Sequence, residues 1–191
     1  MLTPLETPRL WLRTFEEADV AAFAAYRNQP EAARYQSWES ISLARAQSFV
    51  QEQRDLAPGL PGEWFYFAVG LRDTGQLIGD VGLNVLVQDV RQAQVSLTLD
   101  VAFQGQGLGV EAATAVLDYA FINLDLHRVV AVVDVLNTHA VALLERVGLR
   151  REGHFLKNAW FKGRWADEYL YALLQAEWLP RRGLPGALVP R

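Results

Sequence analysis

A glycine-rich turn lies between a strand pattern and a helix pattern, and it constrains the fold more than any other part of this sequence. Before the turn, Val95, Leu97 and Leu99 alternate with polar residues, which predicts a half-buried strand. After the turn, apolar residues recur at helical spacing from Val110 to Phe121. A strand that leads into a helix in this way predicts a domain of the α/β class.

The turn itself has the properties of an anion-binding loop. Its glycines permit positive φ angles and allow the backbone to come close to a bulky ligand. The helix that follows offers free N–H groups and the positive end of its dipole. We therefore expect a pyrophosphate to be held by six consecutive residues, namely Gln104, Gly105, Gln106, Gly107, Leu108 and Gly109.

Hydrophobic periodicity predicts one domain over residues 1–180, with the order β-α-α-β-β-β-α-β-α-β-β. The first helix is expected to begin with a capping box of Thr14 and Glu17, and the last to end at Gly148. Residues 181–191 are expected to form a tail, which ends in a Leu-Val-Pro-Arg sequence like the remnant of a thrombin-cleavable tag. The predicted strands cover 9–13, 64–71, 77–87, 94–101, 129–135, 155–161 and 165–173.

Composition excludes several kinds of chemistry. The chain has no cysteine, which rules out disulfides, thiolate metal sites and cysteine nucleophiles. With no secretory signal pattern, it fits a cytoplasmic location. The three histidines lack the spacing of metal ligands, so no metal is expected. The net charge of −4 argues against nucleic acid as a partner, and no apolar run approaches the roughly 18 residues of a membrane-spanning helix.

The glycine turn alone leaves its ligand open. A phosphate-binding P-loop requires a Gly-Lys-Ser/Thr triplet, which the sequence lacks. A dinucleotide fingerprint that starts at Gly105 and Gly107 requires a third glycine where Val110 stands, although Asp134 could serve as its acid at the end of the next strand. A dinucleotide-binding protein and a turn without a ligand both remain alternatives on this segment.

Several segments read together resemble one protein family. The turn follows the pattern Gln104-x-x-Gly107-x-Gly109, between a strand and a helix. Further matching segments are Glu6–Arg13, Leu126–Val129 and Leu144–Gly153. On these motifs the chain resembles the GNAT superfamily of acetyltransferases, in the branch of the ribosomal-protein N-acetyltransferases RimJ and RimL. The resemblance extends from Leu5 to Trp178.

The resemblance implies a mixed, mostly antiparallel sheet, with flanking helices and a central parallel strand pair that splays apart. It implies that acetyl-CoA is the cosubstrate and lies in this splay, with its pyrophosphate on the glycine turn. Further contacts with acetyl-CoA would come from the main chain of Leu97, Thr98 and Leu99 and from Asn137. The implied activity is direct transfer of an acetyl group to a primary amine, without a covalent enzyme intermediate.

Three positions depart from the family pattern. Gln94 stands where many relatives have a carboxylate, and glutamine cannot act as a base. Leu144 stands where many members have a tyrosine, and Ala140 where relatives often have a serine. The candidates for the catalytic base are therefore Asp80 and Asp134. These departures keep a non-catalytic acyl-CoA-binding module open as an alternative.

The motifs do not identify the acceptor amine. Tyr35 and Trp38 lie between the first two predicted helices, where this superfamily usually builds its acceptor site, and we expect them to contact the substrate. The resemblance points to a protein N-terminal α-amine, with a polyamine or an aminoglycoside as the alternative. By analogy with relatives, a homodimer is also an expectation.

Overall fold

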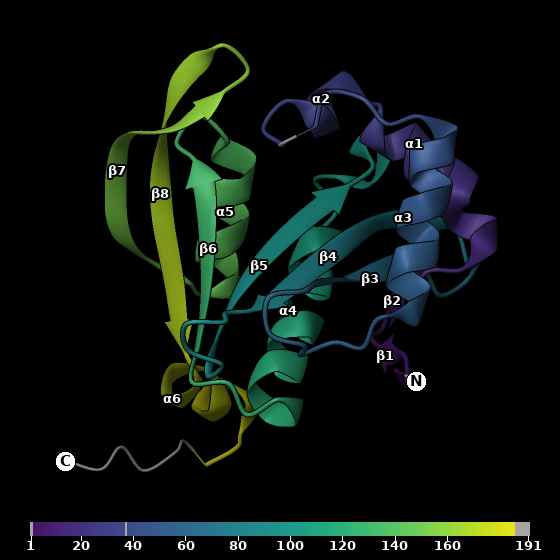
Figure 1. Cartoon of the computed structure of the whole chain (residues 1–191). Coiled ribbons are helices and arrows are strands. Elements are labelled where there is room, and N and C mark those ends of the chain that lie inside the picture. The colour runs from purple at the N-terminus through teal and green to yellow at the C-terminus, as the bar shows by residue number, and fades with distance from the viewer. Residues whose placement is uncertain (1, 37, 186–191) are drawn as a thin grey trace.

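The computed structural model describes residues 2–36 and 38–185, which form one mixed sheet with helices on both faces (Figure 1). The strands are β1 (Leu5–Glu6), β2 (Leu10–Arg13), β3 (Trp64–Leu71), β4 (Leu77–Val85), β5 (Gln92–Leu99), β6 (Arg128–Asp134), β7 (Arg150–Phe161) and β8 (Arg164–Leu174). Within the described residues, these eight strands lie in the order β1-β2-β3-β4-β5-β6-β8-β7. β5 and β6 run parallel, whereas the other neighbours are antiparallel.

Two sets of helices cover the two faces of the sheet. α1 (Val20–Arg27) and α3 (Leu43–Asp55) pack on one face, and α4 (Leu108–Asp118) and α5 (Thr138–Val147) pack on the other over the larger apolar cluster. The remaining helical elements are short. They are α2 (Pro30–Ala33), α6 (Gln175–Trp178), the 3-10 helices η1 (Glu17–Asp19), η2 (Val101–Phe103) and η4 (Leu179–Arg182), and the π-helix η3 (Tyr119–Asn123).

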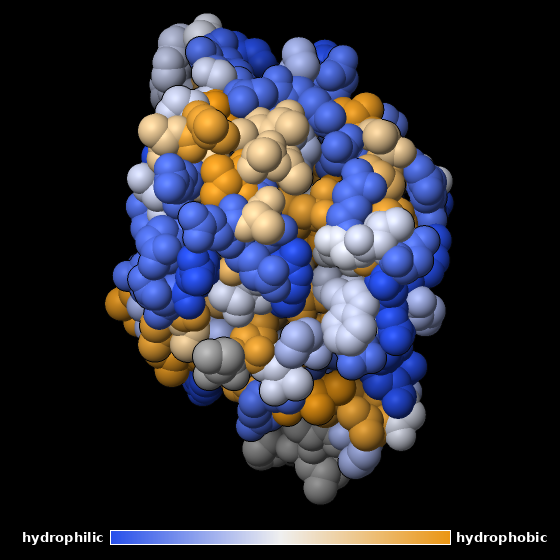
Figure 2. Space-filling view, turned by 90° about the vertical axis from the view of Figure 1, so that its right-hand side faces the viewer, coloured by the Kyte–Doolittle hydropathy of each residue, from blue (hydrophilic) through white to orange (hydrophobic). Residues whose placement is uncertain are grey.

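The outer surface over α1 and α3 contrasts with the buried sides of these helices. Figure 2 shows this side of the molecule, where hydrophilic residues cover much of the surface and hydrophobic residues gather in smaller patches between them. On their buried sides, the two helices contribute Phe23, Tyr26, Ala46 and Val50 to an apolar cluster. An amphipathic helix divides its surface in this way because only its apolar stripe gains from burial.

The parallel pair formed by β5 and β6 is short. Its register ends where Gln94 lies opposite Val130. Beyond that point, β6 continues to Asp134 in a ladder with β8, and β5 continues to Leu99 in a ladder with β4. The two strands therefore separate, as Figure 1 shows. This confirms the predicted sheet with a central splayed parallel pair.

The beginning of the first helix differs from the prediction. Within the described part of the chain, Thr14 and Glu17 do not form the expected capping box. The carboxylate of Asp19 instead accepts a hydrogen bond from the main-chain N–H of Glu16 at 2.8 Å, and it pairs with Arg13 at 2.6 Å. A carboxylate two residues beyond the predicted one therefore takes the capping role, and α1 begins only after it.

The last helical segment of the described residues, η4, packs against the domain. Arg182 in η4 forms an ion pair with Asp118 at the end of α4, at 2.7 Å. The Leu-Val-Pro-Arg sequence falls within 186–191 and lies outside the described residues. Across 2–36 and 38–185, no helix combines the length and apolarity needed to cross a bilayer, and no group of three candidate ligand side chains is placed to hold a metal ion.

Candidate functional site

A cleft of about 440 Å³ lies where β5 and β6 separate. Side chains alternate between the two faces of a strand, so β5 gives the cleft two different walls. Val95 and Leu97 pack toward α4 and α5 with the main apolar cluster. Thr98 projects to the opposite side, because it lies opposite Asp80, and Asp80 contacts α1. Gln94 and Ser96 share this side by the same alternation.

We call this second side the α1 wall, defined by Trp38, Trp64, Tyr66, Ser96 and Glu168. Its packing depends on Gly82 in β4. A Cβ atom at position 82 would lie 2.5 Å from the Ser96 hydroxyl and 2.8 Å from the Tyr66 ring. Because glycine has no Cβ, the Tyr66 ring can lie over β4 and stack with Trp64 at 5.7 Å between ring centres.

The edge of β5 that faces the cleft has main-chain polar groups without a strand partner among the described residues. β4 pairs with the other edge as far as Leu99, whereas β6 pairs with this edge only as far as Gln94. Buried N–H and C=O groups require hydrogen-bond partners, so this free edge suits a ligand that can pair with it. The predicted contacts Leu97 and Thr98 line the cleft along this edge, and Leu99 follows at its end.

The glycine turn follows β5 and η2 and leads into α4. Gly105 and Gly107 have φ angles of 73° and 78°, in the region that favours glycine. Gly107 is the N-cap residue of α4, so the N–H groups of the next turn have no partner within the helix. Arg9 braces the turn from β1–β2, donating to the Gln106 carbonyl at 3.0 Å and pairing with Glu111 at 2.6 Å.

The other predicted residues of the turn have structural roles. The Gln104 side chain donates to the Leu99 carbonyl at 3.0 Å, and the Gln106 side chain donates to the Ala102 carbonyl at 2.9 Å. Leu108 is buried in the main core. At Gly109, a Cβ atom would lie 2.8 Å from Leu143 of α5. Glycine is therefore needed at this position for close packing of the helices, in addition to any approach of a ligand.

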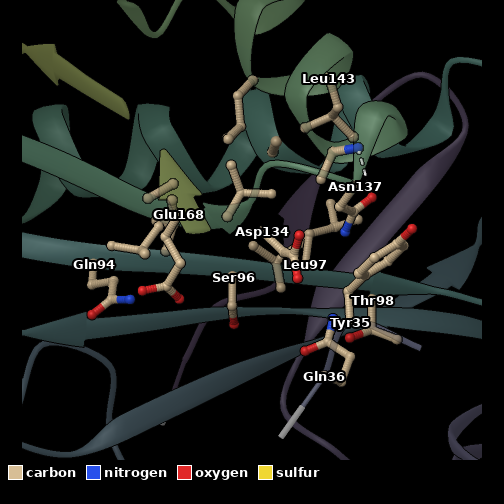
Figure 3. A pocket seen from close by; sticks show the side chains of 18 of the residues that line it. Tyr35, Gln36, Gln94, Ser96, Leu97, Thr98, Asp134, Asn137, Leu143 and Glu168 are labelled. Carbon is tan, nitrogen blue, oxygen red and sulfur yellow. Dashed lines mark hydrogen bonds between the residues drawn. The ribbon is translucent and has the colours of Figure 1, made fainter. Parts of the chain in front are cut away.

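Asn137 has two roles in one position. Its side-chain oxygen accepts a hydrogen bond from the main-chain N–H of Ala140 at 3.2 Å, which caps α5. Asn137 also lines the cleft, where Figure 3 shows it beside Asp134 and Leu143. Its amide nitrogen is left to contact a ligand.

Tyr35 and Trp38 reach the cleft from the segment that follows α2. The Tyr35 hydroxyl donates to the carbonyl of Leu136 at 3.0 Å, and so connects this segment with the loop after β6. Trp38 donates from its indole N–H to the Arg27 carbonyl at 3.1 Å, and the Arg27 guanidinium lies 3.9 Å from the centre of its ring. Both predicted substrate residues therefore line the cleft.

Asp80 lies behind the α1 wall and does not line the cleft. Its carboxylate pairs with Arg27 at 2.7 Å and accepts a hydrogen bond from the Tyr26 hydroxyl at 2.5 Å. Burial raises the pKa of Tyr26 well above its usual value, and the charge of Asp80 raises it further. Since its carboxylate is already bound to two partners in the core, this geometry does not favour Asp80 as the catalytic base.

Asp134 lies at the end of β6 and lines the cleft. One carboxylate oxygen accepts a hydrogen bond from the main-chain N–H of Leu136 at 2.8 Å, and the other pairs with Arg164 at 2.5 Å. Both oxygens therefore have partners. Because neither oxygen is left without a partner, this geometry does not favour Asp134 as the base either.

Glu168 was missed by the reading of the sequence. It lies on β8 directly opposite Asp134 and belongs to the α1 wall. Figure 3 shows its side chain pointing toward those of Gln94 and Ser96 on β5. The alternation of β8 was the available signal, but only the pairing of β8 with β6 brings this residue to the cleft.

The three departures from the family pattern all fall on the cleft, which is lined by Gln94, Ala140 and Leu144. They therefore change the chemistry of the cleft itself. Leu144 adds an apolar surface where many members have a hydroxyl. Gln94 provides an amide at the point where the strands separate.

Comparison with known proteins agrees with this geometry. A family model described as an acetyltransferase (GNAT) domain matches residues 9–150. The chain belongs to the GNAT acetyltransferase family. The resemblance of the sequence to this family is thereby confirmed, and so is the predicted acetyl-CoA-dependent N-acetyltransferase activity.

The names of similar proteins state different acceptors. This acetyltransferase is 30% identical to the uncharacterized N-acetyltransferase p20 of Bacillus licheniformis over 91% of this chain and 97% of that protein. It is 30% identical to the ribosomal protein uS5-alanine N-acetyltransferase of Escherichia coli (strain K12), over 63% of each chain. The crystal structure of spermidine N-acetyltransferase from Vibrio cholerae, in complex with CoA and spermine, superposes with a TM-score of 0.78 at 25% identity and covers 91% of this chain and 99% of that one.

Proposed function

We propose that this acetyltransferase transfers the acetyl group of acetyl-CoA directly to the α-amine of a peptide or protein bound against the α1 wall. The observation that supports this acceptor most is the composition of that wall. It combines the aromatic rings of Trp38, Trp64 and Tyr66 with a single carboxylate, that of Glu168. Such a wall suits one ammonium group attached to an uncharged chain.

We place acetyl-CoA along the free edge of β5. Its pantetheine amides would pair with the main chain of Leu97, Thr98 and Leu99. Its pyrophosphate would lie on Gln104–Gly109, where the N–H groups at the start of α4 are available. Asn137 would contact it from the side of β6. When bound, acetyl-CoA supplies an activated thioester carbonyl.

The chain can stabilise the charge that develops on that carbonyl. A main-chain N–H on the free edge of β5 is fixed in place, because the ladder with β4 holds the strand from its other side. A fixed donor at the site of a developing oxyanion lowers the barrier without reorganisation at the moment of reaction. We assign this donor to the segment Leu97–Leu99, which also positions the acyl group.

A polyamine is the alternative acceptor, since one relative is named for spermidine. A polyamine has several ammonium groups, each of which needs a carboxylate or a similar partner when it leaves water. Of the two carboxylates that line the cleft in the described residues, Asp134 already pairs with Arg164. The remaining carboxylate matches one ammonium group, which favours a monoamine.

The proposal is tested with a panel of acceptors at equal concentration. The panel contains a peptide whose one amine is the α-amine of its N-terminal alanine, and a matched peptide whose N-terminus is acetylated and whose one amine is a lysine side chain. Its other two acceptors are spermidine and an aminoglycoside. Thiol release and mass spectrometry of each product are followed. We expect kcat/KM for the free α-amine to exceed that of the others by about tenfold or more. A preference for spermidine or the aminoglycoside would overturn the α-amine assignment.

A non-catalytic acyl-CoA-binding module would give a different result in the same panel. Acetyl-CoA would raise the melting temperature by binding the folded state, but no acceptor would release thiol. The expected homodimer rests on analogy with relatives alone, and sedimentation of the purified protein measures it. Whether the protein is a monomer or a dimer does not change the interpretation of the acceptor panel.

A further inference from the structure

Two carboxylates that line the cleft, Asp134 and Glu168, and one behind it, Asp80, differ in their ion pairing. Asp80 pairs with Arg27 at 2.7 Å, and Asp134 pairs with Arg164 at 2.5 Å. Glu168 has no cationic partner among the described residues, and its one side-chain hydrogen bond comes from the amide of Asn158 at 2.5 Å. An arginine partner offsets the negative charge of a carboxylate, so among these three Glu168 keeps its charge available to an ammonium group.

The position of Glu168 also matches the need for a base. Its side chain points from β8 into the cleft, on the side where Figure 3 shows Gln94 and Ser96 of β5. The sequence places an amide at Gln94, where relatives often have a carboxylate. The structure brings a carboxylate to the same cleft from β8, where Glu168 lies opposite Asp134 at the end of β6.

We propose that Glu168 is the group that accepts the proton of the attacking amine, in place of a carboxylate at position 94. This assignment rests on the proposed transfer to a primary amine. Asn158 donates to one carboxylate oxygen, Oε2, and the other, Oε1, accepts no side-chain hydrogen bond from the described residues. The hydrogen bond orients the group without neutralising its charge.

The proton balance of the step is simple. Glu168 takes one proton from the ammonium group of the acceptor, directly or through one water molecule. The neutral nitrogen attacks the thioester carbon, a C–N bond forms, and the C–S bond breaks. The leaving thiolate takes up the second proton from nitrogen. The products are the amide, the CoA thiol and protonated Glu168, which returns its proton to solvent.

The other titratable groups around Glu168 do not compete for this role. From β6 and β8, Asp134 and Arg164 form a pair, and from α1, Arg27 is held by Asp80. Tyr66 on β3 stays protonated at neutral pH, since burial raises its pKa above 10.0 and the charge of Asp80 raises it further. On β7, the contact is the uncharged amide of Asn158, opposite this part of the wall.

The test compares Glu168→Gln, Glu168→Asp and Asp167→Asn in the full-length protein. Asp167→Asn is the matched control, because it removes the neighbouring carboxylate from the opposite face of β8, where Asp167 contacts His154. Initial rates with the α-amine peptide are measured between pH 6.5 and 9.5, values chosen to bracket the ordinary pKa of an α-amine, about 8. The affinity for acetyl-CoA is measured by calorimetry.

If the proposal holds, Glu168→Gln lowers kcat/KM about 100-fold at pH 7 and leaves the affinity for acetyl-CoA unchanged. The deficit shrinks toward pH 9.5, because the amine then loses its proton to solvent. Glu168→Asp recovers part of the rate, and Asp167→Asn has the wild-type pH profile. A deficit that is the same at every pH, or a rate for Glu168→Gln within about threefold of wild type, overturns the proposal.

Failure of the proposed function gives a separate signature. If the wild-type protein releases no thiol with any amine, the acceptor assignment fails before a variant is compared. If Glu168→Gln loses its fold, its melting temperature no longer rises with acetyl-CoA. The decision then rests on Glu168→Asp, which must show the shallow recovery with pH that a displaced carboxylate gives; wild-type rates at every pH would overturn the proposal.

Discussion

The guanidinium of Arg27 lies 2.7 Å from the carboxylate of Asp80, and both side chains are almost completely buried. Burial lowers the pKa of Arg27, but the charge of Asp80 and the contact with Tyr26 outweigh it and raise the pKa above its ordinary value. The pair therefore stays ionised inside an aromatic environment, where Trp38 covers the guanidinium. Through the contact of Arg27 with Trp38, the pair supports the α1 wall on the side away from the cleft.

Asp80→Asn should act on stability. It leaves the charge of Arg27 buried without a partner, so we expect a loss of about 3 to 5 kcal/mol in the free energy of unfolding. Urea denaturation measures this loss. The control is Glu52→Gln, which breaks an exposed pair with Arg45 and should cost less than about 1 kcal/mol. Equal costs for the two variants would contradict the role given to the buried pair.

Gly107→Val should weaken the binding of acetyl-CoA. Valine at a φ of 78° strains the turn and displaces the N–H groups at the start of α4. We expect the calorimetric Kd to rise about tenfold or more. Gly75→Val is a matched control, because Gly75 has a φ of 73° in the β3–β4 turn with open space around it. Both variants should lose similar stability, and an unchanged Kd for Gly107→Val would remove the turn from the cofactor site.

Trp38→Ala should act on the acceptor and leave acetyl-CoA unaffected. Its ring forms part of the α1 wall, so its loss should raise the KM for the acceptor about tenfold, with the KM for acetyl-CoA unchanged. Trp11→Ala is the control. Trp11 lies on β2, and the guanidinium carbon of Arg72 lies 5.2 Å from the centre of its ring, in a similar cation–π contact. A rise in both KM values, or in neither, would argue against an acceptor site at Trp38.

The stability contributed by the hydrogen bonds of Glu111 with Thr7 and Arg9 should depend on pH. Burial alone would raise the pKa of Glu111, but hydrogen bonds from Thr7 and Arg9 lower it below 4.5. A carboxylate whose pKa is lower in the folded than in the unfolded protein stabilises the fold at pH values above its unfolded pKa, near 4.5. It loses this contribution as the pH falls through its folded pKa. Glu111→Gln should therefore be less stable than wild type by about 1 to 2 kcal/mol at pH 7. Melting temperatures should converge as the pH falls toward 3; a constant difference between pH 7 and pH 3 would contradict this account.

The sequence predicted the parts of the fold that depend on local patterns. Alternation of Val95, Leu97 and Leu99 identified β5 and the wall toward α4, and Gly148 ends α5 with a φ of 103°, as expected. The first helix was wrong at its start because Asp19 accepts from the N–H of Glu16 and pairs with Arg13, so the cap forms two residues later than Thr14. Local pattern could not rank these two caps.

The candidate site was harder to predict than the fold, since its residues come together through long-range pairing. The partner of Asp80 is Arg27, which is far from it in sequence, so the burial of Asp80 in an ion pair could not be seen. Glu168 enters the cleft only because β8 inserts between β6 and β7. A motif defines residues that are close in sequence, and this base candidate belongs to no motif.

The most direct test of the account is a transfer experiment with acetyl-CoA labelled in its acetyl group. The protein is incubated with this substrate and a peptide that has a free α-amine, and both peptide and intact protein are analysed by mass spectrometry. The account predicts label on the peptide α-nitrogen, in equal amount to the thiol released, and an unlabelled protein. A stably labelled protein, or thiol release without a labelled peptide, would contradict direct transfer to an amine in this cleft.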